Sequence, residues 1–358
     1  MTIRANRRTS LAPATLLAVI IGLAAASSAP AAEAVVATVP GADFQVGSTP
    51  IVQTVDFTTD LPVNGVGFTA RWSAVVADTK GGVAPWSLDL EIDVTAPDGT
   101  SQLAWAPIGG DRTIASYPLQ DATSGFARVG GTGAFEWTFS SISGPWIAGL
   151  SDVSYHLTTT VTDVVEVREG STATGPLWDR PFFIAGISGL GPVVYHATTF
   201  RVPVSGLYTF DCVVPVGNNF TYLYRNTFDA DQPLVGLLDY GLGNGSAPNG
   251  TPQGTSLIEA LLLRDETHTF VVSQWSATQA GQPYTNTITG PGAIITCVGD
   301  LDGSGAIGFG DLTALLATYG ACPAIPDPCL ADFDRNGSVG FTDLTILLAN
   351  WGGCADAS

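Results

Sequence analysis

Residues 300–311 read DLDGSGAIGFGD, and residues 332–343 read DFDRNGSVGFTD. In a twelve-residue calcium loop, oxygen ligands come from positions 1, 3, 5, 7, 9 and 12, and a glycine at position 6 makes the sharp turn. Both stretches match this pattern, with Gly305 and Gly337 at position 6. The sequence therefore predicts the same metal-binding loop twice.

The predicted ligands follow from the loop positions. The first loop offers Asp300, Asp302, Ser304, the carbonyl of Ala306 and Asp311; the second offers Asp332, Asp334, Asn336, the carbonyl of Ser338 and Asp343. Three carboxylates so close together repel one another, and a divalent cation offsets that repulsion. We therefore expect two calcium ions as the only cofactors.

An apolar stripe follows each loop. In the first repeat it comprises Leu312, Leu315, Leu316 and Tyr319; in the second it comprises Leu344, Leu347, Leu348 and Trp351. The spacing i, i+3, i+4, i+7 predicts a short amphipathic helix that a glycine ends. No helix is expected before either loop, because three prolines precede the second and IITCVG before the first is typical of extended chain. We also expect Ile307 and Val339, at position 8, to pair the two loops side by side.

Two half EF-hands with Asp at position 12 resemble a type I dockerin over residues 298–354. The resemblance implies a calcium-folded module that docks onto a cohesin. Dockerins commonly carry a Ser-Thr pair and basic residues at their recognition positions, whereas this chain has Phe309-Gly310, Phe341-Thr342, Leu316-Ala317 and Leu348-Ala349. The expected partner is therefore a cohesin-like or other extracellular protein.

Four of the five cysteines lie near these repeats. Cys297 and Cys329 precede the loops by three residues, and Cys322 and Cys354 follow the predicted helices. Within one repeat the two cysteines would be separated by roughly 15 Å of mostly helical chain, beyond disulfide reach. Antiparallel helices would carry each helix end back to the entrance of the other loop, so we predict the disulfides Cys297–Cys354 and Cys322–Cys329. Cys212 alternates with apolar residues, which indicates a buried, unreactive thiol.

Residues 35–297 alternate between apolar and polar positions, as in SLDLEIDV at residues 87–94. We expect two antiparallel β-sandwiches, residues 35–168 and 191–297, joined by a linker at 169–190 that is rich in Gly, Pro, Ser and Thr. The first weakly resembles P-domain-like modules in LDLEIDVTAPDGTS, and the second resembles pre-peptidase C-terminal-like modules in FRVPVSGLYTFDC. Both resemblances imply non-catalytic modules. The predicted fold is mostly β: two sandwiches followed by a small α dockerin-like module.

The N-terminus has the pattern of a secretory signal peptide. Arg4, Arg7 and Arg8 precede an apolar run at residues 16–26, and small residues follow, with cleavage expected after Ala31 or Ala34. We assign residues 1–34 to the signal peptide and expect an extracellular protein. No later stretch is predicted to span a membrane, and a net charge of −19 argues against nucleic acid as a partner.

The sequence contains no recognisable catalytic motif. The three histidines, His156, His196 and His268, fall in predicted strands, and Asp89, Glu91, Asp93 and Glu136 fit a solvated strand face. Seven tryptophans are candidates for a sugar-stacking surface: Trp72, Trp86, Trp105, Trp137, Trp146, Trp178 and Trp275. We predict a secreted, non-catalytic protein that acts in extracellular assembly or attaches to polysaccharide. The alternatives are a secreted hydrolase or accessory protein of polysaccharide degradation, and a carbohydrate-binding protein without cleavage.

Overall fold

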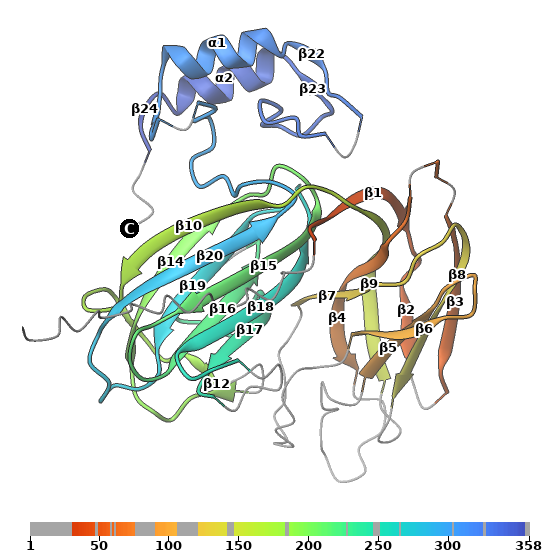
Figure 1. The fold of residues 1–358 in the computed structure, drawn as a ribbon, viewed down its shortest axis with the longest axis horizontal. Helices are drawn as coiled ribbons and strands as arrows, with labels where there is room; N and C mark the ends of the chain where they lie inside the picture. Colours follow the sequence, from red (N-terminus) through yellow and green to blue (C-terminus); the bar gives the residue numbers. More distant parts are fainter. Residues whose placement is uncertain are drawn as a thin grey trace, which may run out of the picture. The chain divides into compact units, whose positions relative to one another are not determined.

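The computed structural model describes residues 31–354, except 47–48, 58, 61, 76–89, 106–120, 142–146, 183–185, 227, 246–250, 265, 303 and 325–326. The signal-peptide prediction for residues 1–30 and the position of Asp89 lie outside the described residues. In the described part the fold is mostly β with two short helices (Figure 1), so the predicted fold class is confirmed.

The first sandwich encloses an apolar core between two layers. One layer is a four-stranded sheet with the order β3 (Ile51–Phe57), β8 (Gly133–Ser141), β5 (Leu90–Thr95), β6 (Ser101–Trp105). The other contains β1 (Glu33–Pro40), β2 (Phe44–Val46), β4 (Gly65–Val75), β7 (Asp121–Ala127) and β9 (Ile147–Thr160). Phe68, Trp137 and Tyr155 meet at its centre, with Phe68 and Trp137 fully buried. The alternation of Ile92 and Val94 inward with Glu91 and Asp93 toward solvent is as predicted.

The second sandwich has the same construction from later strands. One sheet has β10 (Val164–Ser171), β20 (Pro283–Gly290), β15 (Gly206–Val213) and β18 (Thr255–Leu262). The other has the order β11 (Leu177–Trp178), β14 (Val193–Phe200), β19 (His268–Gln274), β16 (Asn219–Arg225), β17 (Leu237–Gly243). The two-stranded sheet of β12 (Pro181–Phe182) and β13 (Gly186–Ile187) lies apart from both. The core between the layers includes Phe210, Phe270 and the buried free thiol of Cys212.

The expected boundary between the first sandwich and the linker, at residues 168 and 169, falls inside a strand. Residues 164–171 form β10, which pairs along its whole length with β20 of the second sandwich. Strands β11, β12 and β13 then occupy much of residues 177–187. β10 is an edge strand whose Val165 and Val167 remain exposed, so neither of its faces is strongly buried.

Strand β1 joins the two sandwiches into one sheet. It pairs with β9 of the first sandwich from Glu33 to Pro40, and its first residues also pair with Leu207 and Gly206 of β15. The large sheet therefore has nine strands with the path β10-β20-β15-β1-β9-β4-β7, with β18 and β2 attached to it.

The C-terminal region is a small helical unit with two short ladders. It contains β21 (Ala306–Ile307), α1 (Phe309–Ala317), β22 (Gly320–Ala321), β23 (Ser338–Val339), α2 (Phe341–Ala349) and β24 (Gly352–Gly353). Helices α1 and α2 lie side by side (Figure 1). They are antiparallel, because Phe309 at the start of α1 contacts Trp351 just beyond α2, with ring centroids 5.1 Å apart.

The predicted pairing of the two loops through Ile307 and Val339 is wrong. Strand β21 of the first loop pairs with β24, which follows the second helix, and β23 of the second loop pairs with β22, which follows the first. Antiparallel helices bring the end of each helix to the loop of the other repeat. The segment that follows each helix therefore forms the backbone hydrogen bonds with the strand in that loop. Ile307 and Val339 instead bury their side chains in the shared core with Leu315 and Leu347.

Candidate calcium loops and docking surface

The first loop brings its predicted carboxylates together. One oxygen from each of Asp300, Asp302 and Asp311 lies within 4.8 Å of the others. Backbone N–H groups hold them in place: Ser304 N and Gly305 N donate to the two Asp300 oxygens at 3.0 and 2.9 Å. The Ser304 hydroxyl lies 3.0 Å from the carbonyl oxygen of Ala306, so positions 5 and 7 are neighbours as well.

The second loop repeats this arrangement. Oxygens of Asp332, Asp334 and Asp343 also lie within 4.8 Å of one another. Asn336 N and Gly337 N donate to the two Asp332 oxygens at 3.1 and 3.0 Å. At positions 5 and 7, the Ser338 hydroxyl donates to Asn336 Oδ1 at 2.7 Å.

Position 12 connects each loop to its helix. Asp311 accepts from Leu301 N at 2.6 Å, and its other oxygen accepts from Gly308 N at 2.7 Å, which satisfies a free donor where α1 begins. Asp343 accepts from Phe333 N and Gly340 N at the same distances. Burial by itself raises the pKa of the Asp311 carboxyl, but the donated backbone N–H groups outweigh it and lower the pKa below its ordinary value.

The donor set suits calcium. The converging carboxylate groups are all oxygen donors, which hard divalent cations prefer. Gly305 and Gly337 have φ values of 82° and 86°, the left-handed conformation that glycine adopts at no steric cost. The side chains present therefore fit one calcium ion in each loop.

Two disulfides connect the repeats with the predicted pairing. Cys297 bonds to Cys354 and Cys322 to Cys329, with Cα–Cα distances of 5.7 and 5.6 Å. Each bond therefore joins the entrance of one loop to the segment after the other repeat's helix. The Cys322 sulfur lies 3.4 Å from Asp332 Oδ2, so this disulfide is adjacent to the first ligand of its loop.

The predicted apolar stripe of each helix divides into a buried and an exposed part. Leu315 and Leu347 are fully buried, and Leu312 and Leu344 pack against the same core. The rest of each stripe is exposed because the core between two short antiparallel helices is narrow. The exposed residues, which include the helix-initiating phenylalanines, are Phe309, Leu316 and Tyr319 in the first repeat and Phe341, Leu348 and Trp351 in the second.

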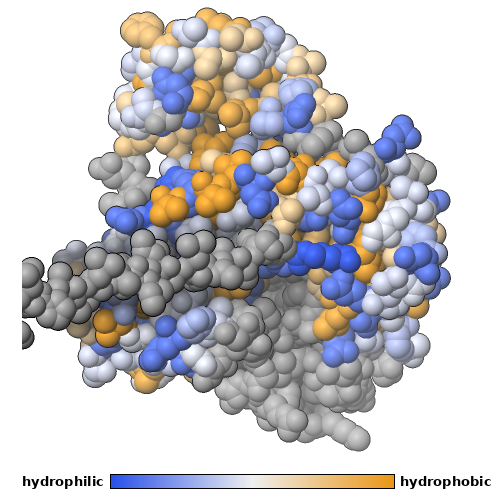
Figure 2. Space-filling view, in the orientation of Figure 1, coloured by the Kyte–Doolittle hydropathy of each residue, from blue (hydrophilic) through white to orange (hydrophobic). Residues whose placement is uncertain are grey.

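This exposed set, which we call the helix surface, lacks charge. Phe309 and Phe341 are 78% and 76% exposed. The only charged residues in α1 and α2 are the loop ligands Asp311 and Asp343. Figure 2 shows hydrophobic residues over much of the visible face of the C-terminal unit. Solvent-facing helix positions are ordinarily charged or polar, so an uncharged apolar face indicates a contact surface.

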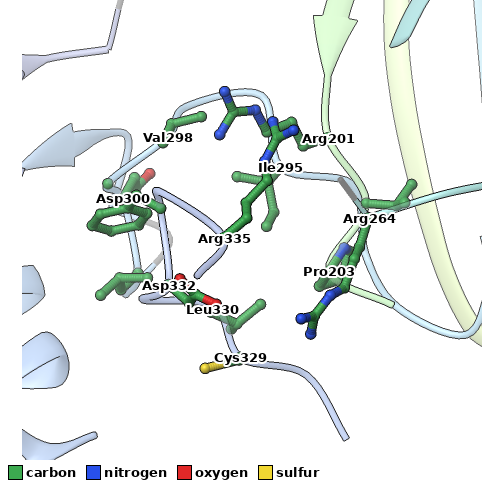
Figure 3. Close-up of a pocket in the computed structure, with 14 residues that line it drawn as sticks. Arg201, Pro203, Arg264, Ile295, Val298, Asp300, Cys329, Leu330, Asp332 and Arg335 are labelled. Carbon is green, nitrogen blue, oxygen red and sulfur yellow. The ribbon is translucent and has the colours of Figure 1, made fainter. Parts of the chain in front are cut away.

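A pocket adjoins the first ligand of each loop (Figure 3). It is lined by Asp300 and Asp332 together with the arginines Arg201, Arg264 and Arg335. Burial lowers the pKa of Arg201, and the neighbouring charge of Arg335 lowers it further. The arginines reduce the negative potential around the two aspartates.

The other residues considered for catalysis have structural roles. His156 is buried and bonds to Thr38 and Thr69; burial first, and then the charge of Arg225, lowers its pKa to about 3. His268 is buried too, with its pKa lowered to about 4, chiefly by burial. His196 contacts the Tyr284 hydroxyl and the Thr174 carbonyl.

The remaining candidate residues that the structure describes lie on a solvated strand face or in the core. Glu91, Asp93 and Glu136 lie on the outer face of their sheet. Burial raises the pKa of the Cys212 thiol to about 12, in keeping with an unreactive group. Trp137 and Trp178 are core residues, and Trp275 stacks on Phe220, with ring centroids 5.0 Å apart. The side chains of the other four candidate tryptophans, Trp72, Trp86, Trp105 and Trp146, lie outside the described residues.

No protein-family model matches the chain, and no curated protein matches it. Among solved structures, the N-terminal CBM22-1-CBM22-2 tandem domain of a Paenibacillus barcinonensis protein aligns with 74% of this chain and 100% of its own, at 11% identity and a TM-score of 0.21. The structure of the Gx strain of infectious bursal disease virus aligns with 72% of this chain and 70% of its own, at 11% identity and a TM-score of 0.15. TM-scores this low do not establish a common fold, and they carry no functional implication. Neither helix of the described residues is long and apolar enough to cross a membrane.

Proposed function

We propose that residues 298–354 form a calcium-dependent docking module of the dockerin kind, which attaches the two β-sandwiches to another extracellular protein. The observation that carries the proposal is the helix surface: an exposed, uncharged, apolar face on both helices. A few buried residues supply most of the energy in protein interfaces, and aromatic side chains are prominent among them. The partner is accordingly expected to offer an apolar recognition face and to bind with little salt dependence.

Two further observations support dependence on calcium. The region has seven acidic residues and one arginine, and six of the acidic residues form the two carboxylate clusters. Bound calcium would neutralise that repulsion and stabilise the loops. Phe309 and Phe341 come two residues before the position-12 ligands Asp311 and Asp343. The calcium ion of each loop would therefore hold the turn of backbone that presents the phenylalanine of that loop.

The disulfides support an extracellular setting. Two disulfides in one small region persist in oxidising compartments and are rare in the cytosol. Secretion, which the N-terminal pattern predicts, would place the region in such a compartment.

The test uses the full chain, immobilised and exposed to the secreted proteins of its native cells, with calcium or with EGTA. Phe309→Ser with Phe341→Ser should abolish retention of a partner that the unchanged chain binds in calcium. Val165→Ser is the matched control, because Val165 is an exposed apolar residue on β10 and does not belong to the helix surface. The captured partner is then purified and its binding measured directly, beside a type I cohesin as a defined probe. Equal binding in calcium and EGTA, or by the double phenylalanine variant, would contradict the proposal.

The sandwiches then serve as the cargo that the module attaches. Attachment to polysaccharide is the second expected role, and hydrolysis of polysaccharide is the alternative. Retention on a panel of plant and algal glycans tests the first, and release of soluble sugars tests the alternative. Sugar release that disappears after a single carboxylate substitution would establish an enzyme.

A further inference from the structure

The start of β1 is built into the sheet from its first residues. The Glu33 carboxylate is buried and accepts from the hydroxyls of Thr158 and Thr160 at 3.1 and 3.2 Å. Ala34 is fully buried, and Val35 N donates to Ser205 O at 2.7 Å. Cleavage after Ala34, one of the two predicted positions, would remove Glu33 and Ala34 from the strand that joins the sandwiches.

The contact between β1 and β15 is too close for a side chain at Gly206. A Cβ added at Gly206 would lie 2.1 Å from the Glu33 carbonyl oxygen, so only glycine permits this approach. Glu33 and Ala34 are the only residues through which β1 pairs with β15. Loss of both would therefore remove the ladder between β1 and β15 and leave only the hydrogen bond from Val35 N to Ser205 O at this junction of the large sheet.

Ala32 immediately precedes this strand, and both its backbone N–H and its carbonyl are hydrogen-bonded. Its carbonyl accepts from Val161 N at 2.9 Å, and its N–H lies 2.5 Å from Asp163 Oδ1. Asp163 takes part in none of the ion pairs found among the described residues. Its carboxylate therefore faces the nitrogen of Ala32 without a charged partner.

We infer that export cleaves the chain between Ala31 and Ala32, and that the α-ammonium created at Ala32 forms an ion pair with Asp163. Small residues at Ala29 and Ala31 satisfy the sequence requirement for cleavage at this bond. Hydrolysis of the Ala31–Ala32 peptide bond by one water releases the carboxylate of Ala31 and the amine of Ala32. At neutral pH that amine is mostly protonated, and a charge-assisted bond to Asp163 is stronger than the one an amide can make. Cleavage thus adds an ion pair beside β1, the strand that connects the two sandwiches. This inference does not depend on the docking function.

The first test is the N-terminus of the exported protein. The full-length chain is produced in a bacterium that secretes it, and the secreted product is analysed by intact mass and N-terminal sequencing. A product that begins at Ala32 supports the inference. One that begins at Val35, or at any other residue, overturns it.

The second test isolates the ion pair. Asp163→Asn is made in two chains, one that begins at Ala32 and one that begins at Ala29. In the second chain the α-ammonium is at Ala29, three residues before Ala32. The substitution should lower the melting temperature by roughly 1–3 °C more in the first form than in the second. Asp60→Asn, at an exposed aspartate, is the control and should act equally in both forms. An equal effect of Asp163→Asn in both forms overturns the assignment.

Discussion

Opening the disulfide Cys297–Cys354 should destabilise the C-terminal unit more than opening Cys322–Cys329. The first bond closes a sequence separation of 57 residues and the second a separation of 7. In the chain-entropy model, these closures restrict the unfolded chain by about 4.2 and about 2.5 kcal/mol. Among its described residues the unit has six buried apolar residues in its core, so a loss of this size is large for it.

The assay is hydrogen exchange of the full chain, read by mass spectrometry on peptides from α1 and α2 in EGTA. At 1.4 kcal/mol per tenfold, Cys297→Ala with Cys354→Ala should reduce helix protection by roughly 1000-fold. Cys322→Ala with Cys329→Ala should reduce it by roughly 60-fold. The two variants remove the same chemical groups, so each is the matched control of the other. Calcium should restore part of the protection in both, because metal binding adds to folding free energy.

The test is which of the two disulfide variants loses more helix protection. Equal losses would show that the disulfides act through local native contacts and not through the unfolded chain. A greater loss for the short closure would show that the contact of Cys322 with Asp332 matters more than loop length. Either result would refute the entropic account.

Three other outcomes are expected. Isothermal titration of the full chain should detect two calcium ions, one after Asp300→Ala, and none after Asp300→Ala with Asp332→Ala. Hydrogen exchange of β10 and β20 should be the same in calcium and in EGTA, because the described part of the sandwiches contains no carboxylate cluster like those of the loops. The pKa of His156 falls from about 6.5 in the unfolded chain to about 3 in the folded one. The contribution of neutral His156 to the free energy of unfolding is therefore complete above pH 6.5 and is lost toward pH 3, at about 1.4 kcal/mol per pH unit. His156→Gln should give a melting temperature that varies less between pH 7 and pH 5.

Local patterns in the sequence determined the two carboxylate loops, the helices that follow them and most of the strand alternation. The convergence of the loop carboxylates could be predicted because twelve consecutive residues contain most of each cluster, including the glycine whose backbone the turn requires. Strand alternation predicted the inward positions of Ile92 and Val94, because a strand turns successive side chains to opposite faces. Helix length, a local quantity, excluded a disulfide within one repeat, and the pairing of Cys297 with Cys354 rested in addition on an expected antiparallel arrangement of the helices.

Only the tertiary structure decided which segments pair and which apolar residues remain exposed. Leu315 and Leu316 are adjacent and chemically identical, yet one is buried and the other half-exposed, because the position of the partner helix selects the inward face. Likewise, any backbone N–H can pair with any carbonyl, so nothing in residues 164–171 identifies β20 as their partner, and nothing in Ile307 identifies Gly352. The position of Ala32 beside Asp163 depends on a contact across 131 residues, which the chain reaches only when the sheet that contains β1 is complete.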